Sequence, residues 1–104
     1  MGPISLLEDH REPLERLCRQ YAVRRLRLFG SALTDRWDPL RSDIDFLAEF
    51  GPPEGMDAFE RYMGFVLALR ELLGHEVEVV DWHAAKNPFF RRSAERLTVE
   101  LYAA

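Results

Sequence analysis

Hydrophobic side chains recur along the chain at two different spacings, and the change from one spacing to the other predicts an alternation of helices and strands. A first helix begins at Pro13, a residue type favoured in the first helical turn, and carries apolar side chains at i, i+3, i+4 and i+7: Leu14, Leu17, Cys18 and Tyr21. The longest helical pattern covers residues 56–73 and ends at Gly74, a typical left-handed cap. Asn87 followed by Pro88 predicts the start of a last helix, which ends near residue 97.

Strand signals separate these helices. We expect strands at residues 23–29, 43–50 and 75–81 and a short edge strand at residues 98–102. Gly30 ends the first strand, residues 34–41 form a polar loop, and residues 51–55 form a turn rich in Gly and Pro. Residues 1–12 are expected to hold one short turn of helix. Helices that alternate with strands predict an α/β or α+β fold, in which helices pack on a small mixed β-sheet.

Size and charge limit what such a fold can do. With 104 residues, of which 47% are hydrophobic, the chain is expected to form a single domain over residues 1–104. Its formal net charge of −4 disfavours general nucleic-acid binding. No apolar stretch is long enough for a membrane span, and the N-terminus does not have the pattern of a secretion signal. Because the single Cys18 cannot form an internal disulfide, we expect a cytoplasmic protein.

Two aspartates, Asp43 and Asp45, are the most informative residues of the chain. One residue separates them in an expected strand, so their side chains point the same way. Such carboxylates repel each other unless a cation or a shared proton compensates them. Glu78 leaves the face that Val77 and Val79 occupy, and it would join the aspartates if the second and third strands are neighbours. Three oxygen donors suit a hard cation such as Mg²⁺, as one ion or two.

A second signal lies upstream, where an apolar strand runs into Gly30 and Ser31. A strand that breaks into such a turn exposes backbone N–H groups that can hold an anion. Each signal alone has an ordinary explanation, since acidic residues are common on solvent-facing strands and Gly-Ser is a frequent turn. The order of strand, Gly-Ser, loop, Asp-Ile-Asp, strand and a later acid between valines favours a phosphate site beside a metal site.

Three segments carry a resemblance to a known family: Phe29-Gly30-Ser31, Ser42-Asp43-Ile44-Asp45-Phe46 and Val77-Glu78-Val79-Val80. They resemble the minimal nucleotidyltransferases of the DNA polymerase β superfamily, of the antitoxin type that is encoded beside HEPN-domain toxins. The resemblance extends over about residues 14–102 and implies the nucleotidyltransferase fold. It also implies roles for single residues. Gly30, Ser31 and Ser42 would bind the nucleotide. Asp43 and Asp45 would bind Mg²⁺. Glu78 would complete the metal site and help to deprotonate the attacking hydroxyl.

The activity that the resemblance implies is Mg²⁺-dependent transfer of AMP from ATP to a hydroxyl acceptor, with release of pyrophosphate. In that family type the acceptor is a tyrosine of a HEPN toxin, so the chain would be an antitoxin. A homodimer and a hetero-oligomer are both compatible with so small a domain. An activity of the aminoglycoside-modifying type is disfavoured, because these 104 residues include no second helical domain to hold the acceptor.

The chain departs from the family pattern in two places, and the first of them supports an alternative function. Glu78 stands where the family usually has Asp, and its extra methylene moves the carboxylate by more than about 1 Å. The alternative is therefore a catalytically weak or inactive antitoxin that neutralises its partner by binding. In addition, the loop at residues 32–42 is one residue longer than the common spacing and has Asp35-Arg36-Trp37 in place of Arg-Gly. Substrate contacts in this loop therefore do not transfer.

The remaining polar and aromatic residues give weaker signals. Three histidines share no metal-ligand spacing and are expected to be exposed or structural: His10, His75 and His83. Trp37 would either stack on an adenine base or anchor its loop. Arg36 and Arg41 flank the phosphate site but are expected to be solvated. For Phe89 and Phe90 we expect core packing, with a partner-binding patch as the alternative.

Overall fold

The computed structural model of the protein describes residues 3–34, 37–52, 55–96 and 98–104, and for residues 31, 32 and 93–96 it describes the backbone alone. Helices and strands are interspersed along the chain, and from residue 44 onwards they alternate as the sequence predicts. The elements are α1 (Pro3–Asp9), α2 (Arg11–Gln20), β1 (Val23–Phe29), the 3₁₀ turn η1 (Gly30–Leu33), β2 (Ile44–Phe50), α3 (Ala58–Leu73), β3 (Val77–Asp81), α4 (Pro88–Arg96) and β4 (Thr98–Ala103). None of the described helices has the length and apolar character that crossing a membrane requires.

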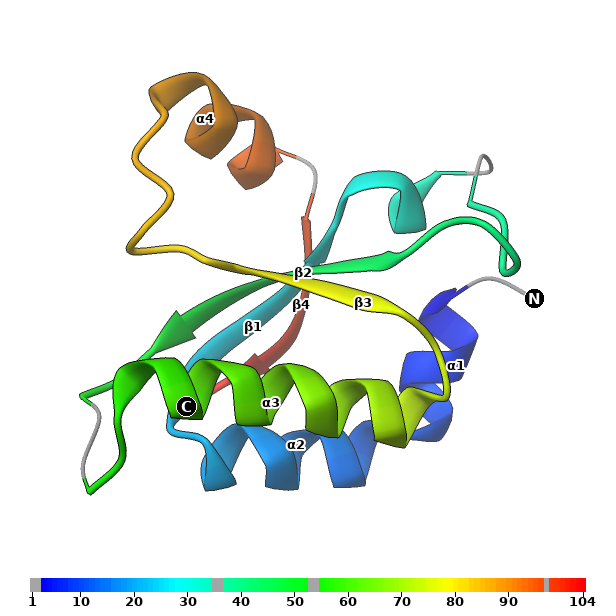
Figure 1. The fold of residues 1–104 in the computed structure, drawn as a ribbon. Coiled ribbons are helices and arrows are strands. Elements are labelled where there is room, and N and C mark those ends of the chain that lie inside the picture. Colours follow the sequence, from blue (N-terminus) through cyan, green and yellow to red (C-terminus); the bar gives the residue numbers. More distant parts are fainter. Residues whose placement is uncertain (1–2, 35–36, 53–54, 97) are drawn as a thin grey trace.

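The described strands form one mixed sheet in the order β3-β2-β1-β4 (Figure 1). β1 pairs antiparallel with β2 on one side and with β4 on the other, whereas β2 and β3 are parallel. A parallel pair needs a crossover connection, and α3 provides it. β2 and β3 are therefore neighbours, which is the condition under which the sequence brings Glu78 to the aspartates.

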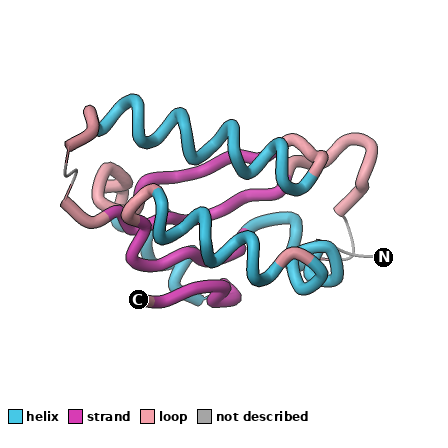
Figure 2. The backbone as a smooth tube through the Cα atoms, turned by 90° about the horizontal axis from the view of Figure 1, so that it is seen from below, coloured by secondary structure: helices cyan, strands magenta, loops and turns pink. Residues whose placement is uncertain are grey.

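One face of the sheet, which we call the core face, packs on α2 and α3. These helices lie next to one another across the strands, as Figure 2 shows from the helix side. Because strand side chains alternate, every second residue points to this face, and these side chains are buried: Leu26, Leu28, Ile44, Phe46, Ala48, Val77 and Val79. Cys18 of α2 is buried in the same cluster. Burial raises the pKa of its thiol to about 12, so Cys18 is an inert core residue.

The opposite face, which we call the polar face, carries the alternate residues of the same strands: Arg27, Phe29, Asp45, Leu47, Glu49 and Glu78. α4 lies on this side of the sheet (Figure 1). Phe90 of α4 packs edge-to-face on Phe29 of β1, with ring centroids 5.8 Å apart. Phe89 is 78% exposed. Consecutive helical residues point about 100° apart, so only one of the pair can face the sheet, and the predicted core packing is wrong for Phe89.

Local signals explain where the helices begin and end. Asp57 caps α3 by accepting a hydrogen bond from the Phe59 N–H (3.0 Å), and Gly74 ends this helix with a left-handed φ of 61°. Asn87 caps α4, as predicted, because its Oδ1 accepts a hydrogen bond from the Phe89 N–H (2.9 Å). α2 begins at Arg11, before the predicted start at Pro13. Proline is tolerated throughout the first turn, whose N–H groups have no partner within the helix.

Candidate functional site

A row of side chains crosses the polar face near the start of β2. In the register of the sheet, Asp45 of β2 lies opposite Glu78 of β3 on one side and opposite Phe29 of β1 on the other. Directly opposed residues point to the same face of a sheet, with Cβ atoms about 5 Å apart. Strand pairing therefore brings the predicted acids Asp45 and Glu78 together.

The carboxyl group of Asp45 is held in surroundings that disfavour its negative charge. Burial, followed by the charges of Glu78 and Asp43, raises its pKa from 3.8 to about 6, and a side-chain hydrogen bond with Glu78 contributes to the shift. Asp45, beside the carboxyl group of Glu78, therefore keeps its proton to a higher pH than an ordinary aspartate does.

Asp43 lies just before β2 rather than inside the strand as predicted, and its side chain is exposed. Its charge is one of those that raise the pKa of Asp45, so the two carboxylates are close enough to interact. The backbone carbonyl of Asp43 accepts a hydrogen bond from the indole N–H of Trp37 (3.2 Å). Loop contacts thus help to place Asp43, whereas the strand ladder places Asp45.

Gly30 is the residue at which the chain turns beside Asp45. Its φ of 79° lies in the left-handed region, which side-chain-bearing residues rarely adopt. A Cβ atom at this position would lie 2.7 Å from Oδ2 of Asp45. Both constraints favour glycine here. The turn η1 starts directly against the Asp45 carboxyl group, so a phosphate held by this turn would lie next to the acids.

The other predicted site residues lie in η1 and in the loop before β2. Ser31 is in η1, but its side chain lies outside the described part of the structure, as does all of Arg36. The Ser42 Oγ accepts a hydrogen bond from the Asp38 N–H (3.1 Å), and the Ser42 N–H donates to the Asp38 carbonyl (2.8 Å). Ser42 thus shapes the loop, while its hydroxyl hydrogen can still be donated to a ligand. Arg41 is exposed, in agreement with the expected solvation.

The donor chemistry of the acids suits a hard divalent cation, because Mg²⁺ prefers carboxylate oxygens. A cation between Asp45 and Glu78 would compensate both charges, which otherwise repel each other and raise the pKa of Asp45. Within the part of the chain that the structure describes, no three Asp, Glu, His or Cys side chains already converge as a metal-binding cluster. Metal binding would therefore require the exposed side chains of Asp43 and Glu78 to change rotamer.

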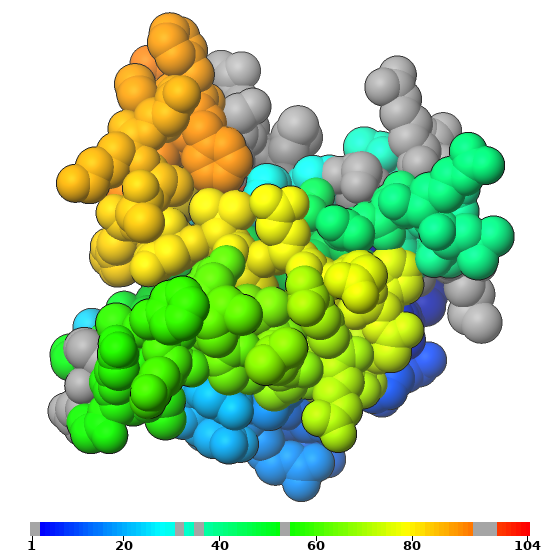
Figure 3. Space-filling model, in the orientation of Figure 1, coloured from blue at the N-terminus to red at the C-terminus, as the bar shows by residue number. Residues whose placement is uncertain are grey.

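Two projections flank the row of acids. In Figure 3, α4 and the loop at residues 37–43 rise on either side of a dip above β3. On the α4 side, two guanidinium groups contact the Trp82 ring, with Arg27 4.8 Å and Arg91 4.6 Å from its centroid. Trp82 was not among the residues predicted from the sequence, because its partners come from β1 and α4, far from it in the chain. Phe29, which lies opposite Asp45, contacts α4 through Phe90. Trp37 of the loop contacts Asp43, so the acids lie between a helix and a loop.

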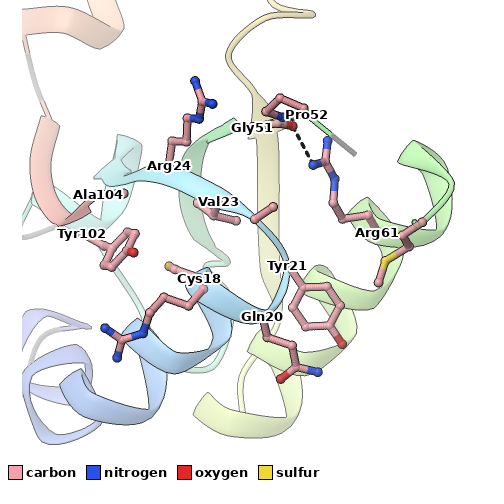
Figure 4. A pocket seen from close by; sticks show the side chains of 13 residues that line it. Cys18, Gln20, Tyr21, Val23, Arg24, Gly51, Pro52, Arg61, Tyr102 and Ala104 are labelled. Atoms are coloured by element: carbon pink, nitrogen blue, oxygen red, sulfur yellow. Dashed lines mark hydrogen bonds between the residues drawn. The ribbon is translucent and has the colours of Figure 1, made fainter. Parts of the chain in front are cut away.

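A separate pocket of about 420 Å³ lies at the other end of the sheet (Figure 4). It is lined by the end of α2, the start of β1 and the segment that follows β2. There the buried Arg61 of α3 donates a hydrogen bond to the Gly51 carbonyl (2.7 Å) and lies over the Phe50 ring. Arg61 ties α3 to the end of β2, and none of the predicted site residues lines this pocket.

Comparisons with known proteins agree with this geometry. The profile of the family described as "Nucleotidyltransferase domain" matches residues 10–101. A curated relative from Methanocaldococcus jannaschii, named "Putative protein adenylyltransferase", is 33% identical over 92 residues, which cover 88% of this chain and 86% of the relative. A solved structure described as a "putative minimal nucleotidyltransferase" is 29% identical, has a TM-score of 0.77 and is matched over 95% of both chains.

A more distant structural match comes from a complex of Shewanella oneidensis, described as a tri-AMPylated HEPN toxin with an MNT antitoxin. Its matching chain is 17% identical and has a TM-score of 0.64, and the match covers 93% of this chain and 72% of that chain. At this identity the likeness concerns the fold. Together with the closer match, it confirms the predicted fold, a small mixed sheet with helices packed on it.

Proposed function

Since the chain belongs to the family of nucleotidyltransferase domains and is a nucleotidyltransferase, we propose that it transfers AMP from ATP to a hydroxyl group of a partner protein. The observation that carries this proposal is the Asp45–Glu78 carboxyl pair beside the turn at Gly30. A Mg²⁺ ion held by Asp43, Asp45 and Glu78 would activate the attacking hydroxyl and stabilise the leaving pyrophosphate.

In the proposed reaction, the acceptor oxygen forms a bond to the α-phosphorus of ATP while the bond from that phosphorus to the pyrophosphate oxygen breaks. The proton of the acceptor hydroxyl passes to the carboxylate of Glu78, which lies opposite Asp45 in the sheet. Gly30 and Ser31 hold the phosphates, and Ser42 contributes a further donor. The turn and the acids adjoin, so the phosphates are bound where the proton is taken up.

The proposed partner is a HEPN-domain toxin, and the proposed acceptor is one of its tyrosines. The Shewanella complex supports this choice, since its toxin is described as tri-AMPylated and bound to an MNT antitoxin. The relative from Methanocaldococcus jannaschii is named a protein adenylyltransferase, which supports a protein as acceptor. In this proposal the chain acts as an antitoxin that modifies its toxin.

The direct test incubates the purified chain with ATP labelled at the α-phosphate, Mg²⁺ and a HEPN-domain toxin as the acceptor protein. We expect label on the HEPN protein, an AMP adduct on tyrosine by mass spectrometry, and loss of labelling on Mg²⁺ removal. The matched control is the chain with both Asp43→Asn and Asp45→Asn. Absence of label with well-folded native protein, or equal labelling by the double variant, would contradict the proposal.

A second candidate function is neutralisation of the toxin by binding alone. Two observations favour it: Glu78 stands where the family usually has Asp, and the described acids do not converge into a metal-binding cluster. The double variant also discriminates here, in cells that express the toxin. Full rescue of growth by Asp43→Asn plus Asp45→Asn would favour binding, whereas loss of rescue with retained complex formation would favour modification.

A further inference from the structure

Trp37 and His75 connect the loop before β2 to the turn before β3. The Trp37 ring lies against the His75 ring, with centroids 5.3 Å apart and planes inclined by 30°. The His75 Nε2 lies 3.1 Å from the Pro39 carbonyl oxygen, and its Nδ1 lies 2.9 Å from the Glu76 carbonyl oxygen. His75 therefore contacts the loop through its ring face and can hydrogen-bond it at Pro39.

The turn that carries His75 is itself anchored to the sheet. Residue 75 was predicted to lie in the third strand, but it lies in the turn between the Gly74 cap of α3 and Val77, the first residue of β3. The Glu76 carbonyl in this turn accepts a hydrogen bond from the Ile44 N–H (3.0 Å), at the first residue of β2. His75 thus has a fixed position relative to the strand that begins next to Asp43.

The contact that matters for the site is the hydrogen bond from Trp37 to the backbone of Asp43. Asp43 precedes the strand, and its side chain is exposed to solvent. Its carbonyl is held by the Trp37 indole N–H at 3.2 Å, and the Trp37 ring is in turn held by His75. These two contacts link the backbone of Asp43 to the same strand pair that carries Asp45 and Glu78.

We propose that Trp37 and His75 are positioning residues that hold Asp43 beside Asp45 so that both carboxylates can bind a divalent cation. This inference rests on the proposed function. It also accounts for Trp37 in a loop that departs from the family pattern, and favours loop anchoring over stacking on a base. Groups that orient metal ligands typically change metal affinity by 10- to 100-fold when they are removed.

The test measures Mn²⁺ affinity by calorimetry, which reports the site without any turnover, and thermal unfolding in parallel. Trp37→Phe keeps the aromatic ring and removes the indole N–H, whereas Trp37→Ala removes both. We expect Mn²⁺ binding about 10-fold weaker for Trp37→Phe and weaker still for Trp37→Ala. His75→Gln, which keeps an amide donor for the Pro39 carbonyl, should retain more affinity than His75→Ala.

The matched control is His83→Ala, which should leave Mn²⁺ affinity unchanged, because His83 is exposed in the turn after β3, at the opposite end of this strand from His75. Wild-type affinity in both Trp37 variants would overturn the positioning role and leave the proposed function standing. Weakening that follows the loss of folded protein, or that His83→Ala reproduces, would also overturn it. If the native chain binds Mn²⁺ no better than the Asp43→Asn plus Asp45→Asn variant, the proposed metal site itself is wrong, and the positioning role falls with it.

Discussion

The two faces of the sheet differ sharply, although the same strands build both. On the core face, side chains such as Phe46 and Val79 are apolar and buried against α2 and α3. On the polar face, Asp45 and Glu78 lie opposite each other, and burial and the neighbouring acids raise the pKa of Asp45 to about 6. Asp45 and Phe46 are neighbours in the chain and point to opposite sides. Alternate residues of one strand thus either pack in the hydrophobic core or form the candidate site.

This separation predicts how substitutions should behave. A side chain on the core face contributes mainly to the free energy of unfolding, because its surroundings are apolar and closely packed. A carboxyl group on the polar face contributes little to stability, since burial and like charges act against its ionised form. Variants of the two faces should therefore be distinguishable by measuring stability and nucleotidyl transfer on the same protein.

The largest effect is expected from Phe46→Ala on the core face. Phe46 is fully buried, and truncation of a buried phenylalanine typically costs about 3–5 kcal/mol through lost contacts and the cavity that remains. We expect the free energy of unfolding in urea to fall by about this amount. Leu40→Ala is the control, because Leu40 is 92% exposed. A loss that is equal in both variants would show that the core face is not the main source of stability.

On the polar face, Asp45→Asn should affect activity and not stability. We expect AMP transfer to fall by about 100-fold or more, which corresponds to about 2.7 kcal/mol of transition-state stabilisation. The free energy of unfolding without metal should stay equal or rise, because the change removes a repelled charge beside Glu78 and Asp43. Labelled-ATP transfer and urea unfolding measure the two quantities. A parallel fall in both would contradict the separation of the faces.

A smaller effect on stability is expected at Gly30, a residue that matters both for the backbone turn and for the candidate site. Gly30→Ala adds the cost of a left-handed backbone, about 1 kcal/mol, and places a Cβ 2.7 Å from the Asp45 carboxyl oxygen. Gly55→Ala is a matched control, because Gly55 also has a positive φ but has no atom near its would-be Cβ. Both variants should lose similar stability from the backbone, and only Gly30→Ala should also lose AMP transfer. Equal activity of the two variants would argue against a site at this turn.

The sequence predicted most of the fold because both faces leave periodic signals. Spacing of 3.6 residues marks α2 and α3, alternation marks the strands, and Gly74 and Asn87 mark helix ends. What failed depends on contacts between distant segments. Phe89 and Phe90 are equivalent in the sequence, and only the position of β1 beneath α4 decides which of them packs on the sheet.

The candidate site was predicted as a set of residue types, and the structure adds how each residue is held. The pairing of Asp45 with Glu78 follows from the parallel neighbours β2 and β3, which the sequence left as a condition. The contact between Trp37 and His75 could not be predicted, because a loop of irregular backbone has no period and its anchor lies far along the chain. The positions of strand residues can thus be predicted from the sequence, whereas the contacts that anchor a loop are known only from the structure.

The smallest predicted effect is a pH dependence of the free energy of unfolding that arises from Asp45 on the polar face. Asp45 has a pKa of about 6 in the folded protein and an ordinary value of 3.8. Between these values the folded state holds a proton that the unfolded state has lost, so this stabilising contribution is complete below about pH 4 and disappears as pH rises through about 6. Because Asp45 is only half-buried, we expect about 1 kcal/mol or less.

Asp45→Asn removes this titration and leaves the other groups of the chain in place, so the difference between variant and native protein isolates it. Measured by urea unfolding with a metal chelator, the stability of the variant relative to the native protein should increase from pH 4.5 to pH 7.5. Mg²⁺ should reduce that increase, since a cation takes over the compensation that the proton provides at low pH. A difference that does not change with pH would mean that the pKa of Asp45 is not raised in the folded protein, and the polar face would lose the feature that sets it apart from an ordinary solvated surface.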